Sequence, residues 1–351
     1  MFKRGFASTF LFDRWRVCCV SLLVIATLTS IGCHTPTTSN SHRTKVTIGI
    51  QVSPAMALLM VAKDKNFFAQ QGLDVDLKQF TAGKFALQAF FAGSVDFAVS
   101  GEVPVCLAVL SGNQVRVVSQ VVEKTTDEVR IVARRDSSSN ASDPSTYFKI
   151  KKRKLATSFG GGPEFFTYNF LQHYGVQPNQ VELLSQRPED MPTALATRSV
   201  DAISIFDPFA YIAEKQLNQD AVTFRGSDLY SELYVLSAHP HQGDDATIQA
   251  LLRAMKQAEA FTAANPDEAK RILQSYTKLD RSVIDGIWGD FSFKIALTPE
   301  LLSDLNAEAQ WAKATGKVTP QTPVPDFSGI IDSHLLRSVD QGALEIQRKE
   351  P

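Results

Sequence analysis

The chain has 351 residues, 44% of them hydrophobic, which is enough to bury the cores of two medium domains or of one two-lobed domain. Its 36 Lys and Arg residues balance 37 Asp and Glu residues, so the overall charge does not favour nucleic acid or an acidic membrane surface as a partner. A charged ligand must therefore be bound by local groups.

The N-terminus has the pattern of an export signal. A basic start, "MFKRGF" and "RWR", precedes the apolar run "VCCVSLLVIATLTS", which is too short to span a bilayer. Residues 1–32 are therefore predicted to be a signal peptide. The Gly32-Cys33 junction resembles the bacterial lipoprotein signal, which implies acylation of Cys33; an uncleaved anchor or a plain secretory signal are the alternatives. Residues 33–44, polar and rich in Ser and Thr, are predicted to be a flexible tether.

The cysteines agree with this division. Of the four cysteines, Cys18 and Cys19 lie in the signal and Cys33 is the acylation candidate, which leaves Cys106 in the mature chain and no disulfide framework. Cys106 lies in the apolar run "VPVCLAVL" and is predicted to be a small buried hydrophobic residue.

From Lys45 onward, strand and helix patterns alternate. In the first half, strands are predicted at 45–51, 73–80, 95–100 and 115–122, and helices at 55–72, 85–93 and 105–110. In the second half, strands are predicted at 154–159, 181–186 and 200–206, and helices at 163–175, 191–198 and 210–217. This alternation predicts parallel sheets with helices on both faces.

The two halves also share a short repeat. Ser-Val-Asp occurs at 94–96 and again at 199–201, each time after a helix and before an apolar strand. The extended segments 129–136 and 232–239 have no helical partner and flank the second half, so they are predicted to be crossing strands between two lobes. Lobe 1 is expected to comprise 45–133 and 235–351, with mostly helical C-terminal residues, and lobe 2 to comprise 137–232.

The turns that follow the predicted strands suggest where a ligand would bind. In open α/β sheets, ligands lie outside the carboxyl ends of the parallel strands. The turns there are small, polar or glycine-bearing and each precedes a helix: "QVSP", "TAGK", "SGEVP", "SFGGGP", "QRPED" and "FDPF". Helix N-termini facing one cleft favour an anion.

Common catalytic motifs are missing. "GGGPE" at 160–164 has neither the GK[ST] ending of a Walker loop nor the spacing of GxGxxG, and the chain contains neither GxSxG nor HExxH. Two of the six histidines lie in the tether and the other four are scattered, so no metal site is expected. The sequence predicts a binding protein, not an enzyme, without a cofactor.

Four segments together resemble a known family. They are "VAKDKNFFAQQGLDVDLKQF", "LQAFFAGSVDFAVSGEVP", "GGGPEFFTYNFLQHYGVQPNQVEL" and "ALATRSVDAISIFDPFA". In order and spacing they resemble the ABC-transporter solute-binding proteins of the nitrate, sulfonate and taurine class. The resemblance implies a periplasmic binding protein fold of type II, with two α/β lobes joined by two crossing strands. It also implies a small anionic or zwitterionic solute in the cleft, and delivery to a membrane permease with its ATPase.

The resemblance also implies a set of cleft residues. By position in the matching motifs they are Gln51, Ser53, Gly83, Lys84, Ser100, Gly101, Glu102, Gly160, Gly161, Gly162, Arg187, Phe206 and Asp207. The chain departs from the family pattern at 206–208, where Phe-Asp-Pro stands in place of the frequent Trp-Glu-Pro.

The charged members of this set leave the ligand chemistry open. Lys84 is either an anion partner or a solvent-facing lysine, and Arg187 either binds a sulfonate or carboxylate or pairs with its acidic neighbours. Glu102 and Asp207 would repel a bare anion and favour an amine, unless they cap the following helices. If both face the ligand, a zwitterion such as an aminosulfonate fits better than nitrate.

The resemblance places the protein in the periplasm or cell envelope, tethered to a membrane by lipid. Two alternatives share its scaffold: a binder of thiamine-pyrimidine precursors, and a pyrimidine-synthase-like enzyme. The enzyme would need a reactive Cys or His near the cleft, and the sequence offers Cys106, in a predicted helix. A sensory binding domain is a further alternative.

Overall fold

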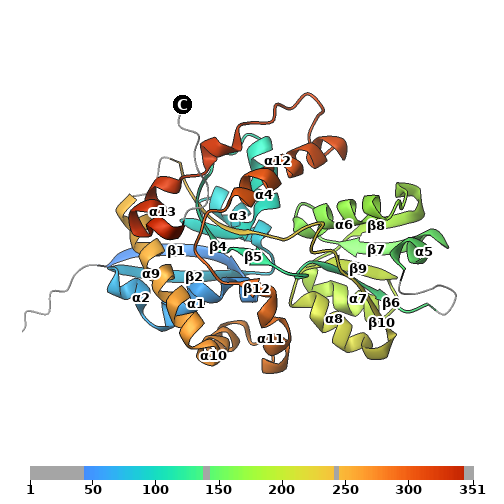
Figure 1. Ribbon diagram of the computed structural model, residues 1–351, viewed down its shortest axis with the longest axis horizontal. Coiled ribbons are helices and arrows are strands. Elements are labelled where there is room, and N and C mark those ends of the chain that lie inside the picture. Colours follow the sequence, from blue (N-terminus) through green and yellow to red (C-terminus); the bar gives the residue numbers. More distant parts are fainter. Residues whose placement is uncertain (1–42, 137–142, 241–244, 344–351) are drawn as a thin grey trace, which may run out of the picture. The chain divides into compact units, whose positions relative to one another are not determined.

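The computed structural model describes residues 43–136, 143–240 and 245–343 (Figure 1). The predicted signal peptide, the lipidation candidate Cys33 and most of the predicted tether lie outside these ranges. Within them, no helix is both long and apolar enough to cross a membrane. Arg43 onward forms one compact unit built on two five-stranded sheets.

The first sheet forms the core of lobe 1 and has the order β2-β1-β3-β11-β4. Its strands are β1 (Thr44–Gln51), β2 (Leu73–Phe80), β3 (Phe97–Gly101), β4 (Arg116–Val122) and β11 (Tyr234–Ala238). β1 is parallel to β2 and β3, whereas β11 is antiparallel to both of its neighbours. Every residue of β3 and β11 is buried, because helices cover both faces of the sheet.

Helices from both ends of the chain cover this sheet. They are α1 (Ala57–Asp64), α2 (Phe67–Gln70), α3 (Gly83–Phe91), α4 (Glu102–Leu110), α9 (Asp245–Ala264), α10 (Pro266–Thr277), α11 (Arg281–Ile287), α12 (Pro299–Ala314) and α13 (Ser333–Val339). α1 packs against α9 and α10, and α4 packs against α12. The single helix predicted at 55–72 is divided, because Asn66 adopts a left-handed conformation with φ of 59°.

The second sheet forms the core of lobe 2 and has the order β10-β6-β9-β7-β8. Its strands are β6 (Arg130–Arg134), β7 (Arg153–Thr157), β8 (Val181–Ser185), β9 (Ala202–Ile205) and β10 (Ala221–Phe224), and its helices are α5 (Pro144–Lys149), α6 (Gly162–His173), α7 (Met191–Ala196) and α8 (Phe209–Leu217). Neither α5 nor β10 was predicted; α5 begins after Asp143, whose carboxylate accepts from the Ser145 and Thr146 N–H groups.

The boundary between the lobes differs from the expectation. Residues up to 133 were assigned to lobe 1, but β6 pairs with β9 and β10 and so belongs to the second sheet. The crossings are therefore the shorter segments 123–129 and 225–233. They are bonded to each other, because the Thr125 N–H donates to the Ser231 hydroxyl at 3.1 Å and that hydroxyl donates to the Thr125 carbonyl at 2.8 Å. β5 (Lys124–Thr125) also pairs with β12 (Phe291–Ser292).

The Ser-Val-Asp repeat has the same structural role in each lobe. The Asp96 carboxylate accepts hydrogen bonds from the Thr47 N–H and hydroxyl, each at 2.7 Å, which ties the start of β3 to β1. The Asp201 carboxylate accepts from the Lys154 N–H at 2.8 Å and ties the start of β9 to β7. The repeat therefore marks equivalent strands of two sheets with the same strand order.

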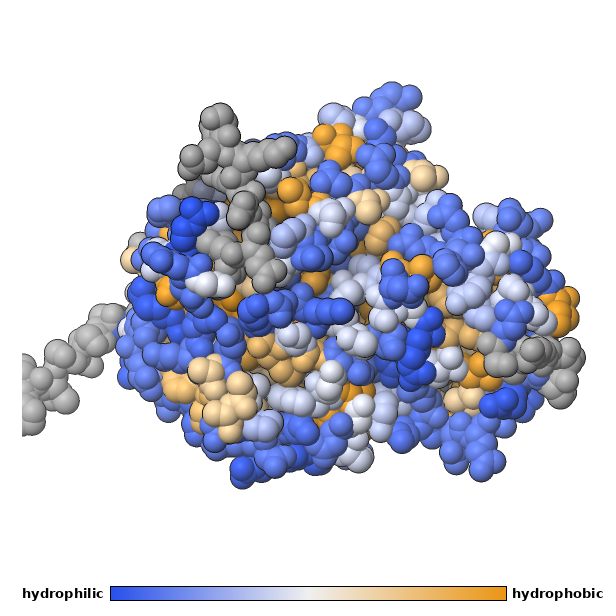
Figure 2. All heavy atoms as spheres, viewed as in Figure 1, coloured by the Kyte–Doolittle hydropathy of each residue, from blue (hydrophilic) through white to orange (hydrophobic). Residues whose placement is uncertain are grey.

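The face of the molecule shown in Figure 2 is mostly hydrophilic, with hydrophobic residues in separate small areas. Among the described residues, the exposed large hydrophobic side chains are Ile150, Phe159 and Leu183.

Candidate functional site

Three helices begin without a side-chain cap where the lobes meet. Gly83 is the first residue of α3, Gly101 is the N-cap of α4 and Gly161 is the N-cap of α6, and no side chain caps any of them. Ser53, by contrast, caps its own short helix through a bond from the Ala55 N–H at 3.2 Å. Uncapped helix starts present N–H donors and positive dipole ends.

The glycines in these turns allow close approach. A Cβ on Gly83 would lie 2.8 Å from the Cα of Ser100, and a Cβ on Gly101 would overlap the Glu232 carboxylate. A Cβ on Gly162 would overlap the Tyr230 hydroxyl and lie 2.9 Å from the Glu232 carboxyl carbon. The Glu232 carboxylate thus lies between the starts of α4 in lobe 1 and α6 in lobe 2.

A hydrogen-bonded chain runs from lobe 1 to the first crossing. The Gly83 N–H donates to Gln51 Oε1 at 2.8 Å, and Gln51 Nε2 donates to the Tyr234 hydroxyl at 3.0 Å. That hydroxyl donates to Glu128 Oε1 at 2.7 Å. Gln51 is buried beneath the surface of the site. Its hydrogen bond holds the Tyr234 hydroxyl in place, and that hydroxyl in turn orients Glu128.

Glu102 is the first residue of α4 and is fully buried. Its carboxylate accepts from the Tyr230 hydroxyl at 2.6 Å and from the Leu233 N–H at 2.8 Å. Burial raises the pKa of this carboxyl to about 8, although both hydrogen bonds act in the opposite direction. Ser100, also buried, donates to the Gly101 carbonyl at 3.0 Å.

Glu102, Glu128 and Glu232 together form a buried carboxylate cluster. Oε2 of Glu128 and Oε2 of Glu232 have no hydrogen-bond partner among the described residues. Burial, and then the neighbouring carboxylates, raise the pKa of Glu128 and of Glu232 well above the ordinary value. These carboxyls therefore keep their protons to a higher pH than free glutamate, and a positively charged N–H donor would favour their ionised form.

Sequence reasoning missed Glu128 and Glu232, although a signal was present. Each lies two residues before a strand, in the related stretches "DEVRIVA" at 127–133 and "SELYVLS" at 231–237. In the structure Tyr234 pairs with Gly101 and Arg130 pairs with Ile205, the last residues of β3 and β9. An antiparallel strand starts at the edge where its parallel neighbours end, which brings both glutamates to the site.

Lys84 spans the two lobes. Its amino group donates to the Ser158 hydroxyl at 2.9 Å and to the Phe159 carbonyl at 2.7 Å, in the loop after β7. Burial lowers the pKa of this amino group. In the same loop, Gly160 has φ of +76°, which favours glycine, and its N–H donates to Glu164 at 2.7 Å.

No hydrogen bond among the described residues joins Arg187, Phe206 or Asp207 directly to this network. The Arg187 side chain is 68% exposed and pairs with Glu189, the alternative considered from the sequence. Asp207 is buried and pairs with Arg130 at 2.8 Å. Its carboxylate also accepts from the Tyr211 N–H at 3.1 Å, so it binds a backbone donor near the start of α8. Burial, opposed by Arg130, raises the pKa of Asp207 to about 6. Phe206 is buried and packs edge-on against Phe209.

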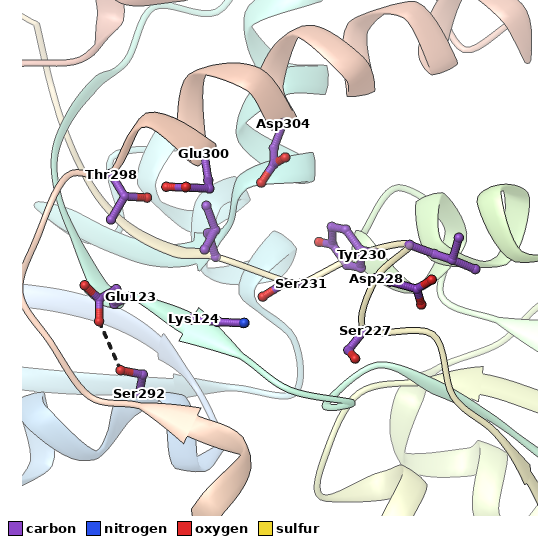
Figure 3. Close-up of a pocket in the computed structure, with 12 residues that line it drawn as sticks. Glu123, Lys124, Ser227, Asp228, Tyr230, Ser231, Ser292, Thr298, Glu300 and Asp304 are labelled. Carbon is purple, nitrogen blue, oxygen red and sulfur yellow. Dashed lines mark hydrogen bonds between the residues drawn. The ribbon is translucent and has the colours of Figure 1, made fainter. Parts of the chain in front are cut away.

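A pocket of about 490 Å³ lies beside the crossings (Figure 3). Its lining comes from both crossings, β12 and the start of α12: Glu123, Lys124, Ser227, Asp228, Leu229, Tyr230, Ser231, Leu233, Ser292, Thr298, Glu300 and Asp304. Figure 3 shows Asp304 projecting from α12 toward the segment that carries Tyr230 and Ser231, whereas the Glu300 carboxylate points to the side of Thr298. The pocket reaches Tyr230, whose hydroxyl contacts Glu102 of the cluster.

Cys106 is buried, as predicted, and its thiol donates to the Leu305 carbonyl at 3.4 Å. Burial raises the pKa of the thiol, which disfavours the nucleophilic thiolate. Within the described ranges, no three or more His, Cys, Asp or Glu side chains are grouped as in a metal site.

Two α/β lobes, two crossings and a buried polar network at the carboxyl ends of the strands define the periplasmic binding protein class, which confirms the expected fold. The sequence model of the family described as NMT1/THI5 like matches residues 53–269, and the chain belongs to this family.

The taurine-binding periplasmic protein of Escherichia coli strain K12 is 24% identical, over 83% of this chain and 92% of that protein. The crystal structure of the periplasmic aliphatic sulphonate binding protein from Escherichia coli aligns with a TM-score of 0.69 at 20% identity, covering 80% of this chain and 95% of that one. The periplasmic nitrate-binding protein from Synechocystis aligns with a TM-score of 0.64 at 18% identity, covering 86% and 89%.

Proposed function

We propose that this protein is the exported solute-binding receptor of an ABC importer, which binds a small solute between its lobes and delivers it to a permease. The observation that carries this proposal is the convergence of three uncapped helix starts from both lobes on one buried network beside two crossings. Such a network can be reached by a solute only if the lobes separate about the crossings.

Contacts that join the lobes directly support a closing motion. Lys84 of α3 bonds to the loop after β7, and Lys317, beyond α12, pairs with Glu164 of α6 at 2.6 Å. The Phe165 and Trp311 rings pack edge-on at 5.4 Å between centroids. These contacts form a set that would be made on closure and broken on opening.

The relatives favour a small anionic or zwitterionic solute, because their names record taurine, sulfonate and nitrate binding. On this chain, the amino group of Lys84, which joins α3 to the loop after β7, offers a charged donor for an anionic end. Because each helix dipole carries only a fraction of a charge, the lysine would supply most of the attraction.

A thermal-shift screen tests this proposal. Taurine, alkanesulfonates, nitrate, bicarbonate and pyrimidines are added to the purified mature protein, and a bound solute raises the melting temperature by mass action. We expect at least one of them to raise the melting temperature in a concentration-dependent way, and to be recovered chemically unchanged. A protein whose melting temperature none of these compounds alters would contradict the proposal, and a product in the recovered solute would indicate an enzyme.

We also propose that the mature chain starts at an acylated Cys33 and is held at a membrane by lipid. The Gly32-Cys33 junction after the apolar run supports this proposal. Mass spectrometry of the mature N-terminus is expected to show a diacylglyceryl group on Cys33, and the Cys33→Ala variant should lose it and leave the membrane fraction. A mature N-terminus elsewhere would contradict the anchor and leave the receptor function untouched.

A further inference from the structure

We propose that the solute carries a protonated nitrogen group, an ammonium or amidinium, and that Glu128 and Glu232 bind this group in the carboxylate cluster. The inference rests on the proposed receptor function and narrows the solute class. It distinguishes a zwitterion or organic cation from a bare anion such as nitrate or an unsubstituted sulfonate.

The cluster has unused acceptors. Glu128 and Glu232 are 1% and 5% exposed, and Oε2 of each has no hydrogen-bond partner within the part of the chain that the structure describes. A buried charged oxygen without a partner is strongly unfavourable, and an N–H donor that bears positive charge removes that penalty most completely. An ammonium has three donors and an amidinium four, so either can bond to both oxygens at once.

The position of Glu232 also argues against a bare anion. Its carboxylate lies against Gly101 and Gly162, at the starts of α4 and α6, which are the helix ends that would otherwise attract an anion. The negative partner of these two helix ends is therefore already part of the chain. A nitrate or sulfonate at this place would face the Glu232 carboxylate directly.

The nearby basic side chains are already engaged. Arg130 pairs with Asp207 at 2.8 Å and with Glu214 at 2.9 Å, and Lys84 bonds to the loop after β7. Burial has the largest effect on the pKa of Glu232 and raises it. Glu102 raises it further and a hydrogen bond with Tyr234 lowers it, and neither of these two groups is a cation. Among the described residues no cation of the chain pairs with these carboxyls, so a cationic solute would favour their ionised form over the protonated form that burial favours.

The pocket beside the crossings is also lined mainly by negatively charged side chains. Glu123, Asp228, Glu300 and Asp304 line it together with one cation, Lys124, and Figure 3 shows these groups around a single hollow. Glu123 is itself bonded to Ser292 and paired with Lys294. Three further carboxylates therefore remain around a pocket that reaches Tyr230 and, through its hydroxyl, Glu102.

The geometry thus offers two subsites of opposite sign. Lys84, which bonds to the loop after β7, supplies the cation, and Glu128 and Glu232 supply the carboxylates, of which Glu232 lies against Gly162 at the start of α6. We expect a zwitterion to be attracted by both kinds of group, whereas an anion is attracted by one and repelled by the other. Taurine and isethionate form a matched pair for this comparison, because they differ in having an ammonium or a hydroxyl group at one end.

Isothermal titration of the mature protein with taurine, isethionate, nitrate, putrescine and benzamidine tests the inference. We expect taurine, putrescine or benzamidine to bind, and isethionate to bind at least about tenfold more weakly than taurine, which corresponds to about 1.4 kcal/mol. Glu128→Gln and Glu232→Gln should each weaken binding of the nitrogen compound about tenfold or more. Glu268→Gln, which removes an exposed carboxylate paired with Lys65, is the matched control and should not change binding.

The outcomes separate the two proposals. Equal binding of taurine and isethionate, or tighter binding of nitrate that the two glutamine variants retain, would overturn the inference and leave the receptor function in place. Binding of Ca²⁺ or Zn²⁺ alone that is lost in the glutamine variants would also overturn it, in favour of a metal ion. Binding of none of these five compounds would overturn the inference, whereas the receptor function is tested by the thermal-shift screen, which also contains bicarbonate and pyrimidines. Circular dichroism melting of each variant checks that it is folded.

Discussion

Gly162 allows the closest approach between lobe 2 and the second crossing, because an added Cβ would overlap the Tyr230 hydroxyl. A Cβ added to Gly161, its neighbour in the same loop, would make ordinary contacts of 3.6 Å with Pro163 and with the Ser158 carbonyl. We expect Gly162→Ala to prevent full closure and to raise the Kd for taurine about tenfold or more, since overpacking of this kind typically costs about 1–3 kcal/mol. Gly161→Ala should leave the Kd within about twofold, and titration calorimetry of the two variants provides the comparison. Equal effects would show that closure does not depend on the contact at Gly162.

Glu128 connects the site to the pH dependence of stability. Burial raises its pKa above the ordinary value of 4.5, and Glu232, Asp207 and Glu102 act in the same direction, while the hydrogen bond from Tyr234 opposes them. The folded protein therefore holds more protons than the unfolded chain above pH 4.5, and the free energy of unfolding falls as pH rises from there.

We therefore expect Glu128→Gln, without bound solute, to be more stable than the unmodified protein at pH 8, by about 1–2 kcal/mol or a few degrees in melting temperature. At pH 4, where the carboxyl is protonated in both states, the two proteins should melt at similar temperatures. The glutamine oxygen keeps the bond from Tyr234, so the change removes charge without removing that contact. Differential scanning calorimetry at both pH values measures the difference. A variant less stable at pH 8 would show that Glu128 has a favourable charge partner in the folded state.

At the scale of elements, the sequence predicted most strands because each has a clear apolar pattern. β2 was predicted at 73–80, as observed, since Leu73, Val75 and Leu77 alternate with polar residues along it. The starts of α3 and α4 were placed too late, because "TAGK" and "GEVP" have turn composition but continue directly into helix. Composition alone does not distinguish an uncapped helix start from a loop.

The site was only partly predictable for a related reason. The glycine turns and Glu102 follow parallel strands, and the general rule for α/β sheets places them at the site. Glu128 and Glu232 precede antiparallel strands, and their location depends on which sheet β6 and β11 join. That choice is made by long-range pairing, which local sequence patterns do not encode.

The Ser-Val-Asp repeat gives a prediction at this scale. The Asp96 carboxylate accepts two hydrogen bonds from Thr47, so Asp96→Ala leaves a strand N–H without its partner at the junction of β1 and β3. We expect a loss of about 1–2 kcal/mol in the free energy of unfolding. Asp74→Ala, at an exposed position of the adjacent strand β2, should change stability by less than about 0.5 kcal/mol. Urea unfolding followed by circular dichroism gives both values. Similar losses of stability in the two variants would show that the Asp of the repeat does not stabilise the junction of β1 and β3.

At the scale of the whole described unit, the two sheets have the same order, with an antiparallel strand in the fourth position of each. The first crossing supplies that strand to lobe 2 and the second supplies it to lobe 1. Each crossing therefore carries its glutamate to the junction of the lobes just before it enters a sheet. Under the proposed function, hinge and binding residues would thus be adjacent in the chain, and a solute that neutralises the cluster would act directly on the segments about which the lobes move.

If the lobes close on a solute, affinity should depend on the ring pair of Phe165 and Trp311, which joins them. Phe165 and Phe170 both belong to α6, but Phe165 packs against Trp311 and Tyr230, whereas Phe170 packs inside lobe 2 against Phe166, Tyr174 and Phe224. An edge-on aromatic pair contributes about 0.5–1.5 kcal/mol, so Phe165→Leu should raise the Kd for taurine about two- to tenfold, mainly through faster dissociation. Phe170→Leu should lower the melting temperature and leave that Kd within about twofold, because it affects the lobe and not its closure. Stopped-flow fluorescence, with calorimetry for stability, separates the two effects. If Phe165→Leu changed only the melting temperature, the contact between α6 and Trp311 would be part of the resting fold and not of closure.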